Sequence, residues 1–200
     1  MSSNLLREPT SNSLLVTRPR SSKQSDEYLT PNYLFKAIRN RLDIAEFALD
    51  AAADDTNTKA AVWYSKDISG LDNEWRTWTW CNPPYSKEGG PLLEWIRKAI
   101  REQIKLHYSV LLLPADTSTH WFALATNFAS KMLLVQPRVR FIDPLTNKKS
   151  GSPKFGSMVL VFGPEKGLMY ENLTLSGWRQ GRPAGKGTST RRNGVRCASA

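Results

Sequence analysis

Four consecutive residues in the middle of the chain have the right types to grip an amino group. They are Asn82, Pro83, Pro84 and Tyr85, and they follow the strand-like segment TWTWC at residues 77–81. The strand must end here, because proline donates no backbone hydrogen bond. The side-chain oxygen of Asn82 and the carbonyl of Pro83 can accept both N–H groups of an exocyclic amine. The ring of Tyr85 can stack on the base that carries that amine.

The same tetrapeptide also has simpler interpretations. It can be a plain turn that ends a strand, or a segment that docks onto another protein, although the common PPxY ligand pattern is absent. Because short motifs match by chance, the choice depends on the elements that surround the motif.

Helix-like and strand-like segments alternate through the central part of the chain. Apolar side chains recur at helical spacing in residues 30–42, 91–105 and 119–129. The first of these begins with a Thr-Pro pair, which predicts a helix start with Thr30 as the cap. Strand-like apolar runs lie at residues 47–53, 60–65, 77–81, 109–114, 131–136 and 156–163.

This alternation predicts an α/β fold with a mostly parallel central sheet flanked by helices. Ligands of such sheets bind outside the carboxyl ends of the strands. Asn82 stands at the predicted end of a strand, so the expected site of chemistry and the motif coincide.

The positive charge of the chain is concentrated at its two ends. The formal net charge is +10, of which residues 1–25 carry +3 and residues 171–200 carry +5. Both ends lack sustained periodicity, which predicts disordered segments around one domain at residues 26–170. Basic tails favour polyanions, but a solvated, solubilising tail is an equally good explanation.

Several classes of protein are disfavoured by the sequence. No run approaches the ~18 apolar residues of a membrane helix, and the N-terminus has no long apolar block typical of a secretory signal. Cys81 and Cys197 are the only cysteines, so a disulfide framework is not indicated. No Cys or His spacing suits a zinc site. We expect a soluble protein of the cytoplasm with no metal and no membrane partner.

Beyond its central motif, the chain resembles the small phage-type DNA N6-adenine methyltransferases, which use S-adenosyl-L-methionine. The resemblance spans roughly residues 26–165 and rests on the ordered segments TPNYLF, FALDAAA, WTWCNPPYS, LLLPADTSTHWF, RVRF and PKFGSMVLVF. It implies a Rossmann-like methyltransferase fold, DNA as partner, a bacterial or phage-infected cytoplasm, and catalytic roles for Asn82, Pro83, Pro84 and Tyr85. The pattern [DNS]-P-P-[YFW] also marks cytosine N4 methyltransferases, and a similar NPPY occurs in protein-glutamine methyltransferases.

The resemblance also implies where the cofactor binds. The segment FALDAAA would contact the methionine part of the cofactor, with Asp50 next to its amino group and Ala51 and Ala52 beside it. Small side chains let a backbone approach a ligand, and the helix expected after the alanines would place its electropositive N-terminus here. Taken alone, DAAA could be a helix start and nothing more.

The segment TPNYLF similarly suggests Thr30, Pro31 and Phe35 along the other side of the cofactor. One feature departs from the family pattern, since the acid that usually ends the second strand is missing from VWYSK. Asp67 is a substitute for that carboxylate, or else an ordinary turn residue.

Contacts with DNA are expected from the segment at residues 137–157. It carries five basic residues among turn formers: Arg138, Arg140, Lys148, Lys149 and Lys154. Such residues position DNA through its phosphates and do not read its sequence. A solvated hairpin loop explains them equally well. The segment SKEGGP at residues 86–91 could serve as a lid with glycine hinges.

These observations favour methylation of adenine N6 in DNA, with the target base flipped out or unpaired. Acceptors on both N–H groups would favour the pyramidal nitrogen that attacks a methyl group. The alternatives are methylation of cytosine N4, RNA adenine or protein glutamine. A DNA-binding relative that has lost cofactor affinity is a further alternative, motivated by the unusual DAAA and the missing acid.

Overall fold

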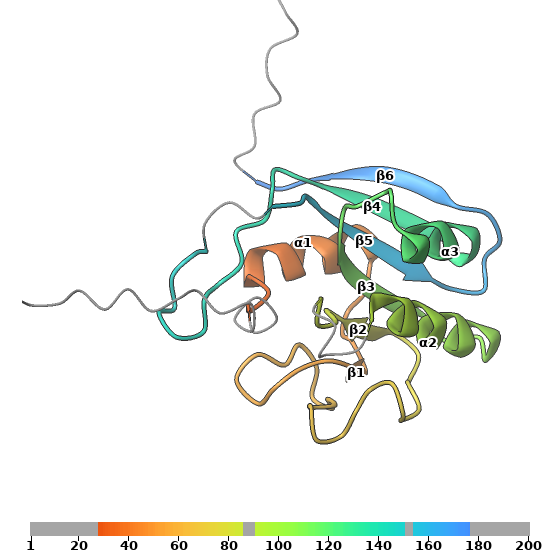
Figure 1. Cartoon of the computed structure of the whole chain (residues 1–200), viewed down its shortest axis with the longest axis horizontal. Coiled ribbons are helices and arrows are strands. Elements are labelled where there is room, and N and C mark those ends of the chain that lie inside the picture. Colours follow the sequence, from red (N-terminus) through yellow and green to blue (C-terminus); the bar gives the residue numbers. More distant parts are fainter. Residues whose placement is uncertain (1–27, 86–90, 151–153, 177–200) are drawn as a thin grey trace, which may run out of the picture.

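The computed structural model describes residues 28–85, 91–150 and 154–176. The predictions for residues 1–25, for residues 177–200 and for the 86–90 loop lie outside these residues. Residues 171–176, predicted as the start of the disordered C-terminal end, are described, and residues 171–174 belong to a strand. Figure 1 shows a single sheet with helices packed against it. The helices are α1 (Asn32–Leu42), α2 (Leu92–Ile104) and α3 (His120–Phe128). The strands are β1 (Leu49–Asp50), β2 (Thr79–Cys81), β3 (Ser109–Pro114), β4 (Lys131–Gln136), β5 (Ser157–Phe162) and β6 (Met169–Thr174).

The sheet is mixed, with the strand order β1-β2-β3-β5-β4-β6. Strands β1, β2 and β3 pair in parallel, and β4 and β6 pair in parallel. Strand β5 is antiparallel to both of its neighbours, so all strands except β5 run in one direction. This confirms the predicted α/β class with a mostly parallel sheet. It also brings the start of β5 to the edge where β2 and β3 end.

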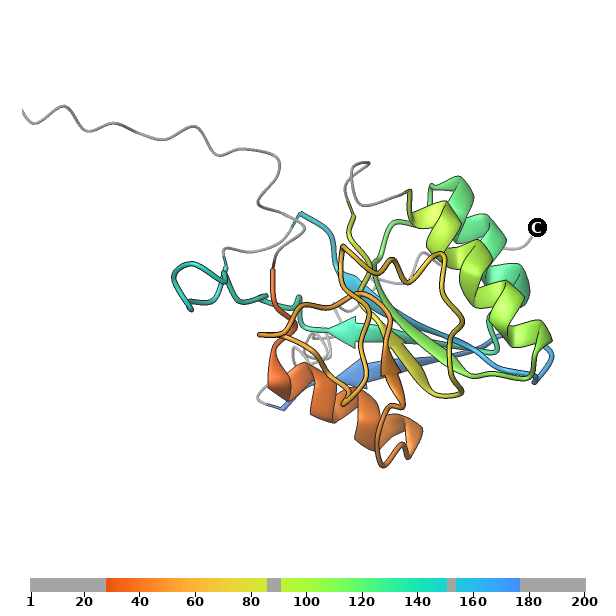
Figure 2. The same ribbon diagram turned by 90° about the horizontal axis from the view of Figure 1, so that it is seen from below.

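The two faces of the sheet are covered by different helices (Figures 1 and 2). Along β3, Val110 and Leu112 point toward the cluster that contains the buried face of α1, while Leu111 and Leu113 point toward α2 and α3. All four side chains are fully buried. The continuous apolar run of β3 therefore reflects burial on both faces, as parallel strands covered by helices require.

The helix predicted at residues 91–105 forms, but not all of its regularly spaced apolar side chains are buried. Ile104 is 78% exposed, whereas Lys98 and Glu102 are buried with Trp95 and Ile96. The two charged side chains form an ion pair of 2.8 Å between Nζ and Oε1. This pairing permits charged groups to occupy the buried face, because a buried charge is tolerated when it has an opposite partner.

The segment between α1 and β2 is less regular than the sequence suggests. The strand predicted at residues 60–65 is reduced to one bridge between Trp63 and Asp50. The helix expected after Asp50 is absent, and residues 51–59 form turns. Asp54 accepts hydrogen bonds from the backbone N–H and the hydroxyl of Thr56. Such local bonds compete with a helix.

Strand β6 was not predicted from the sequence. Leu173 is its only fully buried residue, and its other side chains are polar or exposed, so its pattern resembles a loop. It lies at the edge of the sheet, packs against α1 and pairs Glu171 with Arg41. Residue 170, where the sequence pattern places the end of the domain, falls inside this strand.

Candidate active site

The side chain of Asn82 is held between two hydroxyl groups at the end of β2. Its Nδ2 donates a hydrogen bond to Oγ1 of Thr30 at 3.2 Å. Its Oδ1 accepts a hydrogen bond from the hydroxyl of Tyr85 at 2.9 Å, and that hydroxyl lies 3.0 Å from the carbonyl oxygen of Leu112 in β3. The amide thus links the segment before α1 to the end of β2 and, through Tyr85, to β3.

Strand β2 ends at Cys81, as predicted from the two prolines that follow Asn82. Pro83 is buried and Pro84 is half-buried, while Tyr85 is 37% exposed. Cys81 is fully buried, and this burial raises the pKa of its thiol well above its usual value, so it is not a nucleophile for the site.

A cleft of about 300 Å³ lies beside Asn82, Pro83 and Tyr85. This volume is at the small end of the range for ligand pockets, ~300–1,000 Å³. Its remaining lining comes from the end of β3, the start of β5 and two loops: Tyr28, Pro114, Phe141, Lys154, Phe155, Gly156 and Ser157. The aromatic members are suited to contact a planar ring.

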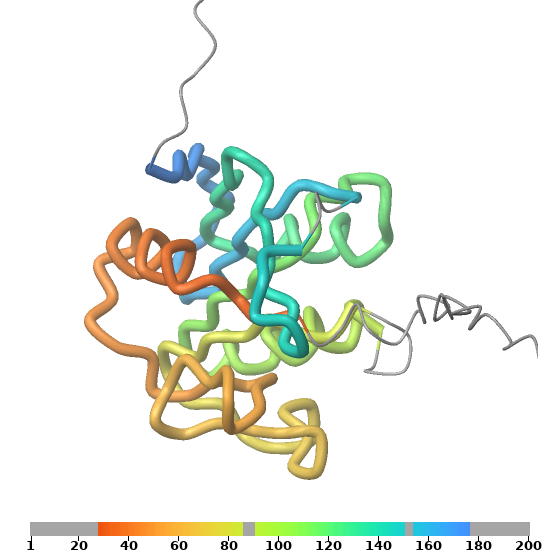
Figure 3. The backbone as a smooth tube through the Cα atoms, turned by 90° about the vertical axis from the view of Figure 1, so that its left-hand side faces the viewer, coloured from red at the N-terminus to blue at the C-terminus, as the bar shows by residue number. Residues whose placement is uncertain are grey.

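Backbone pairing explains how distant segments reach this cleft. Leu29 and Ile142 exchange two backbone hydrogen bonds of 2.9 and 3.1 Å, and their chain neighbours Tyr28 and Phe141 both line the cleft. Figure 3 shows the start of the described chain passing next to this loop. Because β5 is antiparallel, Lys154 and Phe155 arrive at the same edge just before it begins. Tyr28, Phe141 and Phe155 were not singled out from the sequence, because isolated aromatic residues in loops give no local signal.

Asp50 lies at the end of β1, next to β2. Its register partner in β2 is Trp80, two residues before Asn82. The carboxylate is 2% exposed and accepts backbone N–H groups from Ala52 at 3.3 Å and from Lys59 at 2.9 Å. Burial raises the pKa of Asp50 to about 6, despite these hydrogen bonds and the Lys59 ammonium, which lower it.

Thr30 does not cap α1, contrary to the sequence-based expectation. The N-cap of α1 is Pro31, which has no side-chain cap hydrogen bond. Thr30 is 2% exposed, and its hydroxyl serves Asn82 instead. Phe35 points into the core, where its ring meets that of Trp80 edge-on at 5.2 Å.

The other predicted cofactor residues occupy three different settings. Ala51 is fully buried, and its backbone lies against Gly70. A Cβ added to Gly70 would stand 2.1 Å from the carbonyl oxygen of Ala51. Ala52 is half-buried next to Asp50. Asp67 is exposed, and its N–H donates to Oγ of Ser65 at 3.2 Å, which favours the turn interpretation.

All five predicted DNA-contacting residues are exposed, and they lie on the loop between β4 and β5. Lys154 lines the cleft, with its ammonium 5.2 Å from the centre of the Phe155 ring, and Nη1 of Arg138 donates to the carbonyl of Lys154 at 3.3 Å. Lys148 and Lys149 stand on the hairpin closed by pairing of Ile142 with Lys149. The structure thus brings Lys154 and Arg138 to the site.

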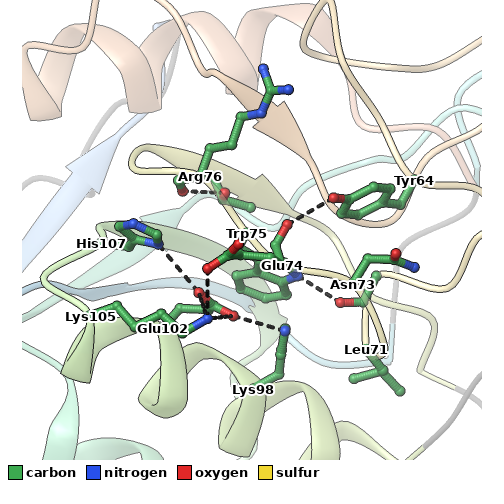
Figure 4. Close-up of polar contacts among 12 residues, drawn as sticks. Tyr64, Leu71, Asn73, Glu74, Trp75, Arg76, Lys98, Glu102, Lys105 and His107 are labelled. Carbon is green, nitrogen blue, oxygen red and sulfur yellow. Dashed lines mark hydrogen bonds and ion pairs between the residues drawn. The ribbon is translucent and has the colours of Figure 1, made fainter.

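A second hollow, of about 510 Å³, lies at the opposite edge of the sheet, before β2 and β3 begin. Glu74, Arg76 and His107 are among its lining residues. Figure 4 shows that the neighbouring Glu102 is surrounded by Lys98, Lys105 and His107, and Lys105 also pairs with Glu74. These contacts account for the cluster as a structural one.

Two kinds of site were also searched for in the described residues. No group of three or more His, Cys, Asp or Glu side chains there could hold a metal ion. None of the helices in the described ranges is both long enough and apolar enough to cross a membrane.

The chain matches a known protein family over most of its length. A family model described as DNA N-6-adenine-methyltransferase (Dam) matches residues 19–180. The chain belongs to this family. Its reaction is methylation of adenine N6 in DNA, and its cofactor is S-adenosyl-L-methionine. The predicted family and activity are thereby confirmed in preference to cytosine N4, RNA adenine and protein glutamine.

Similar proteins of this methyltransferase family occur in phages. The chain is 29% identical over 156 residues to the DNA N-6-adenine-methyltransferase of Haemophilus phage HP1, covering 76% of this chain and 87% of that protein. It is 27% identical over 153 residues to the enzyme of the same name from Escherichia phage T1, covering 68% and 62%. A solved class I S-adenosylmethionine-dependent methyltransferase from Listeria monocytogenes is similar at 14% identity and a TM-score of 0.45, covering 72% and 65%.

The residues at the end of β1 suit the cofactor of the methyltransferase. A carboxylate has about four lone-pair positions, and two backbone N–H groups use only part of them. Asp50 can therefore still accept a hydrogen bond from an ammonium group. A buried carboxylate beside small residues offers an acceptor of opposite charge to the ammonium group of an amino acid portion.

Proposed function

We propose that the cleft beside Asn82 receives the target adenine, flipped out of the DNA stack. The observation that carries this proposal is the side-chain amide of Asn82 at the wall of a cleft lined by aromatic residues. An amide oxygen fixed at such a wall can accept one N–H of the adenine amino group, and the carbonyl of Pro83 can accept the other.

These two acceptors would act on the nitrogen that reacts. The lone pair of the adenine amino group is delocalised into the ring, and accepting both N–H groups favours the pyramidal form in which it is free. Positive charge develops on this nitrogen in the transition state, so fixed oxygens stabilise the transition state more than the ground state. S-adenosyl-L-methionine, when bound, supplies the methyl group.

The aromatic lining would hold the flipped base. Tyr85 and Phe155 are the exposed aromatic residues of the cleft, at 37% and 41%. Stacking of a base on an aromatic side chain is worth ~1–3 kcal/mol, enough to offset part of the unstacking cost of a few kcal/mol. Lys154 at the cleft, with Arg138 beside it, would hold the flanking phosphates.

Asp50 would bind the amino group of the cofactor, with Ala52 beside it. Pro31, just before α1, and Phe35 within α1 belong to this proposal through the family resemblance alone. Since the substrate is DNA, we expect the enzyme to work in the cytoplasm of a bacterial or phage-infected cell.

The proposal is tested by replacing Asn82 and analysing DNA from cells that express each variant. Asn82→Ala should reduce N6-methyladenine, measured by mass spectrometry of nucleosides, by at least about 10²-fold, as for loss of other groups that stabilise developing charge. Asn127→Ala, which changes an exposed asparagine of α3, is the matched control and should equal the parent. Equal methylation in Asn82→Ala and the parent would remove Asn82 from the reaction.

A further inference from the structure

A buried hydroxyl lies behind the amide of Asn82. Thr30 is 2% exposed, and its Oγ1 accepts the Nδ2 hydrogen bond of Asn82 at 3.2 Å across 52 residues of sequence. The opposite side of the amide, Oδ1, is turned toward Tyr85 and the cleft. The orientation of this amide decides whether the cleft presents an acceptor or a donor.

An asparagine amide has two unlike ends. Oδ1 accepts hydrogen bonds and Nδ2 donates them, so a half-turn of the amide would present N–H groups to an amino group that also has N–H groups to donate. The bound amine would then face a donor in place of an acceptor. When the oxygen faces the cleft, Nδ2 is turned to the buried side, where it needs an acceptor from the protein.

We propose that Thr30 is a positioning residue that orients the Asn82 amide, with its oxygen toward the target amino group. This inference rests on the proposed function of Asn82. It gives Thr30 a role distinct from the cofactor contact that the family resemblance implies. Capping of α1 does not explain the buried hydroxyl, since the cap residue is Pro31.

The first test compares two replacements of Thr30 in the full chain. Thr30→Val keeps the shape and removes the hydroxyl, while Thr30→Ser keeps the hydroxyl. At saturating DNA and cofactor, kcat should fall about tenfold in Thr30→Val, the scale of one lost hydrogen bond, and stay within about twofold of the parent in Thr30→Ser. KM for S-adenosyl-L-methionine should be unchanged in both.

A second test uses a background in which orientation no longer matters. In Asn82→Asp both side-chain oxygens are acceptors, so a half-turn has no effect. Adding Thr30→Val to Asn82→Asp should lower kcat by less than about threefold, which is well below its effect in the parent. If Asn82→Asp has no measurable activity, the comparison of valine and serine decides by itself.

Three outcomes would overturn the inference. They are an unchanged kcat in Thr30→Val, a loss confined to KM for the cofactor, and the same loss in both backgrounds. A loss of activity in Thr30→Ser equal to that in Thr30→Val would count against it as well. Failure of the proposed function is a separate result, because it would appear as full activity of Asn82→Ala.

Discussion

The hydroxyl of Tyr85 lies 2.9 Å from the side-chain oxygen of Asn82 and 3.0 Å from the carbonyl oxygen of Leu112. A phenol has one proton to donate, so the two oxygens share it. In the free protein this hydroxyl occupies the acceptor that the target amine is proposed to use. When the amine binds Asn82, the hydroxyl can donate fully to Leu112, and the ring need not leave the cleft.

These contacts allow the role of the Tyr85 ring to be tested separately from the role of its hydroxyl. Tyr85→Phe keeps the stacking surface and frees Oδ1 of Asn82, so we expect kcat/KM for DNA within about threefold of the parent. Tyr85→Ala removes the stacking surface, worth ~1–3 kcal/mol, and should lower kcat/KM by about 10–100-fold. Both values come from methylation of a short DNA duplex. A phenylalanine variant as impaired as the alanine variant would show that the hydroxyl is what the reaction requires.

The comparison of sequence and structure shows which local signals were sufficient. Apolar runs on β3 and β5 predict their strands, because burial on both faces leaves an unbroken hydrophobic pattern. The apolar run of β4 also predicts its strand, although only one face of β4 is fully buried. The polar edge strand β6 has no such pattern. The reversed direction of β5 is also invisible locally, since a strand has the same pattern in either direction.

The site was only partly predictable for a related reason. The end of β2 was identified because two prolines cannot continue a strand. The contact between Thr30 and Asn82 depends on how α1 packs, and the same holds for the pairing of Leu29 with Ile142 that brings Tyr28 and Phe141 to the cleft. The Thr-Pro pair predicts Thr30 as a cap because it is a common helix start, but in the fold the Thr30 hydroxyl accepts a hydrogen bond from Asn82 instead.

The raised pKa of Asp50 predicts a pH dependence of stability. Its folded pKa of about 6 exceeds the ordinary value of 3.8, so the native state binds the proton more tightly than the unfolded state. The contribution of Asp50 is therefore most favourable below pH 4 and declines until about pH 6. The total decline is about 3 kcal/mol, because one pKa unit is ~1.4 kcal/mol.

Replacing Asp50 with asparagine should remove this dependence. The unfolding free energy of Asp50→Asn minus that of the parent should rise by up to about 3 kcal/mol between pH 4 and pH 7 in urea titrations. Any constant offset from a lost hydrogen bond does not affect this slope. Asp72→Asn, which removes an exposed carboxylate, is the control for the change in net charge. A flat difference for Asp50→Asn would mean that Asp50 titrates normally.

The basic loop predicts a salt dependence of DNA binding. Each phosphate contact that is lost should make the negative slope of log K against log salt shallower by about 1. We expect this change for Lys154→Ala, which alters the cleft, and for Lys149→Ala on the hairpin. Arg101→Ala, on the exposed face of α2 near its far end, should leave the slope unchanged. Fluorescence anisotropy with labelled DNA at several salt concentrations measures the slopes. Unchanged slopes for both lysine variants would favour a solvated loop.

The buried ion pair on α2 predicts a large loss of stability without a loss of chemistry (Figure 4). Burial opposes ionisation of Glu102, but Lys98 and Lys105 outweigh it and hold its pKa below the usual value. Glu102→Gln would leave the buried ammonium of Lys98 without its partner, and breaking such a pair costs about 3–5 kcal/mol. Glu94→Gln breaks the exposed pair with Arg97 on the same helix and should cost less than about 1 kcal/mol.

Because this cluster lies at the edge of the sheet opposite Asn82, the folded Glu102→Gln variant should methylate DNA at the parental rate. Replacing both partners, as in Lys98→Met with Glu102→Leu, removes the unpaired charge and should restore much of the lost stability. Urea unfolding and methylation assays well below the melting temperature measure the two properties separately. Equal destabilisation by Glu102→Gln and Glu94→Gln would show that the buried pair contributes no more than a surface pair.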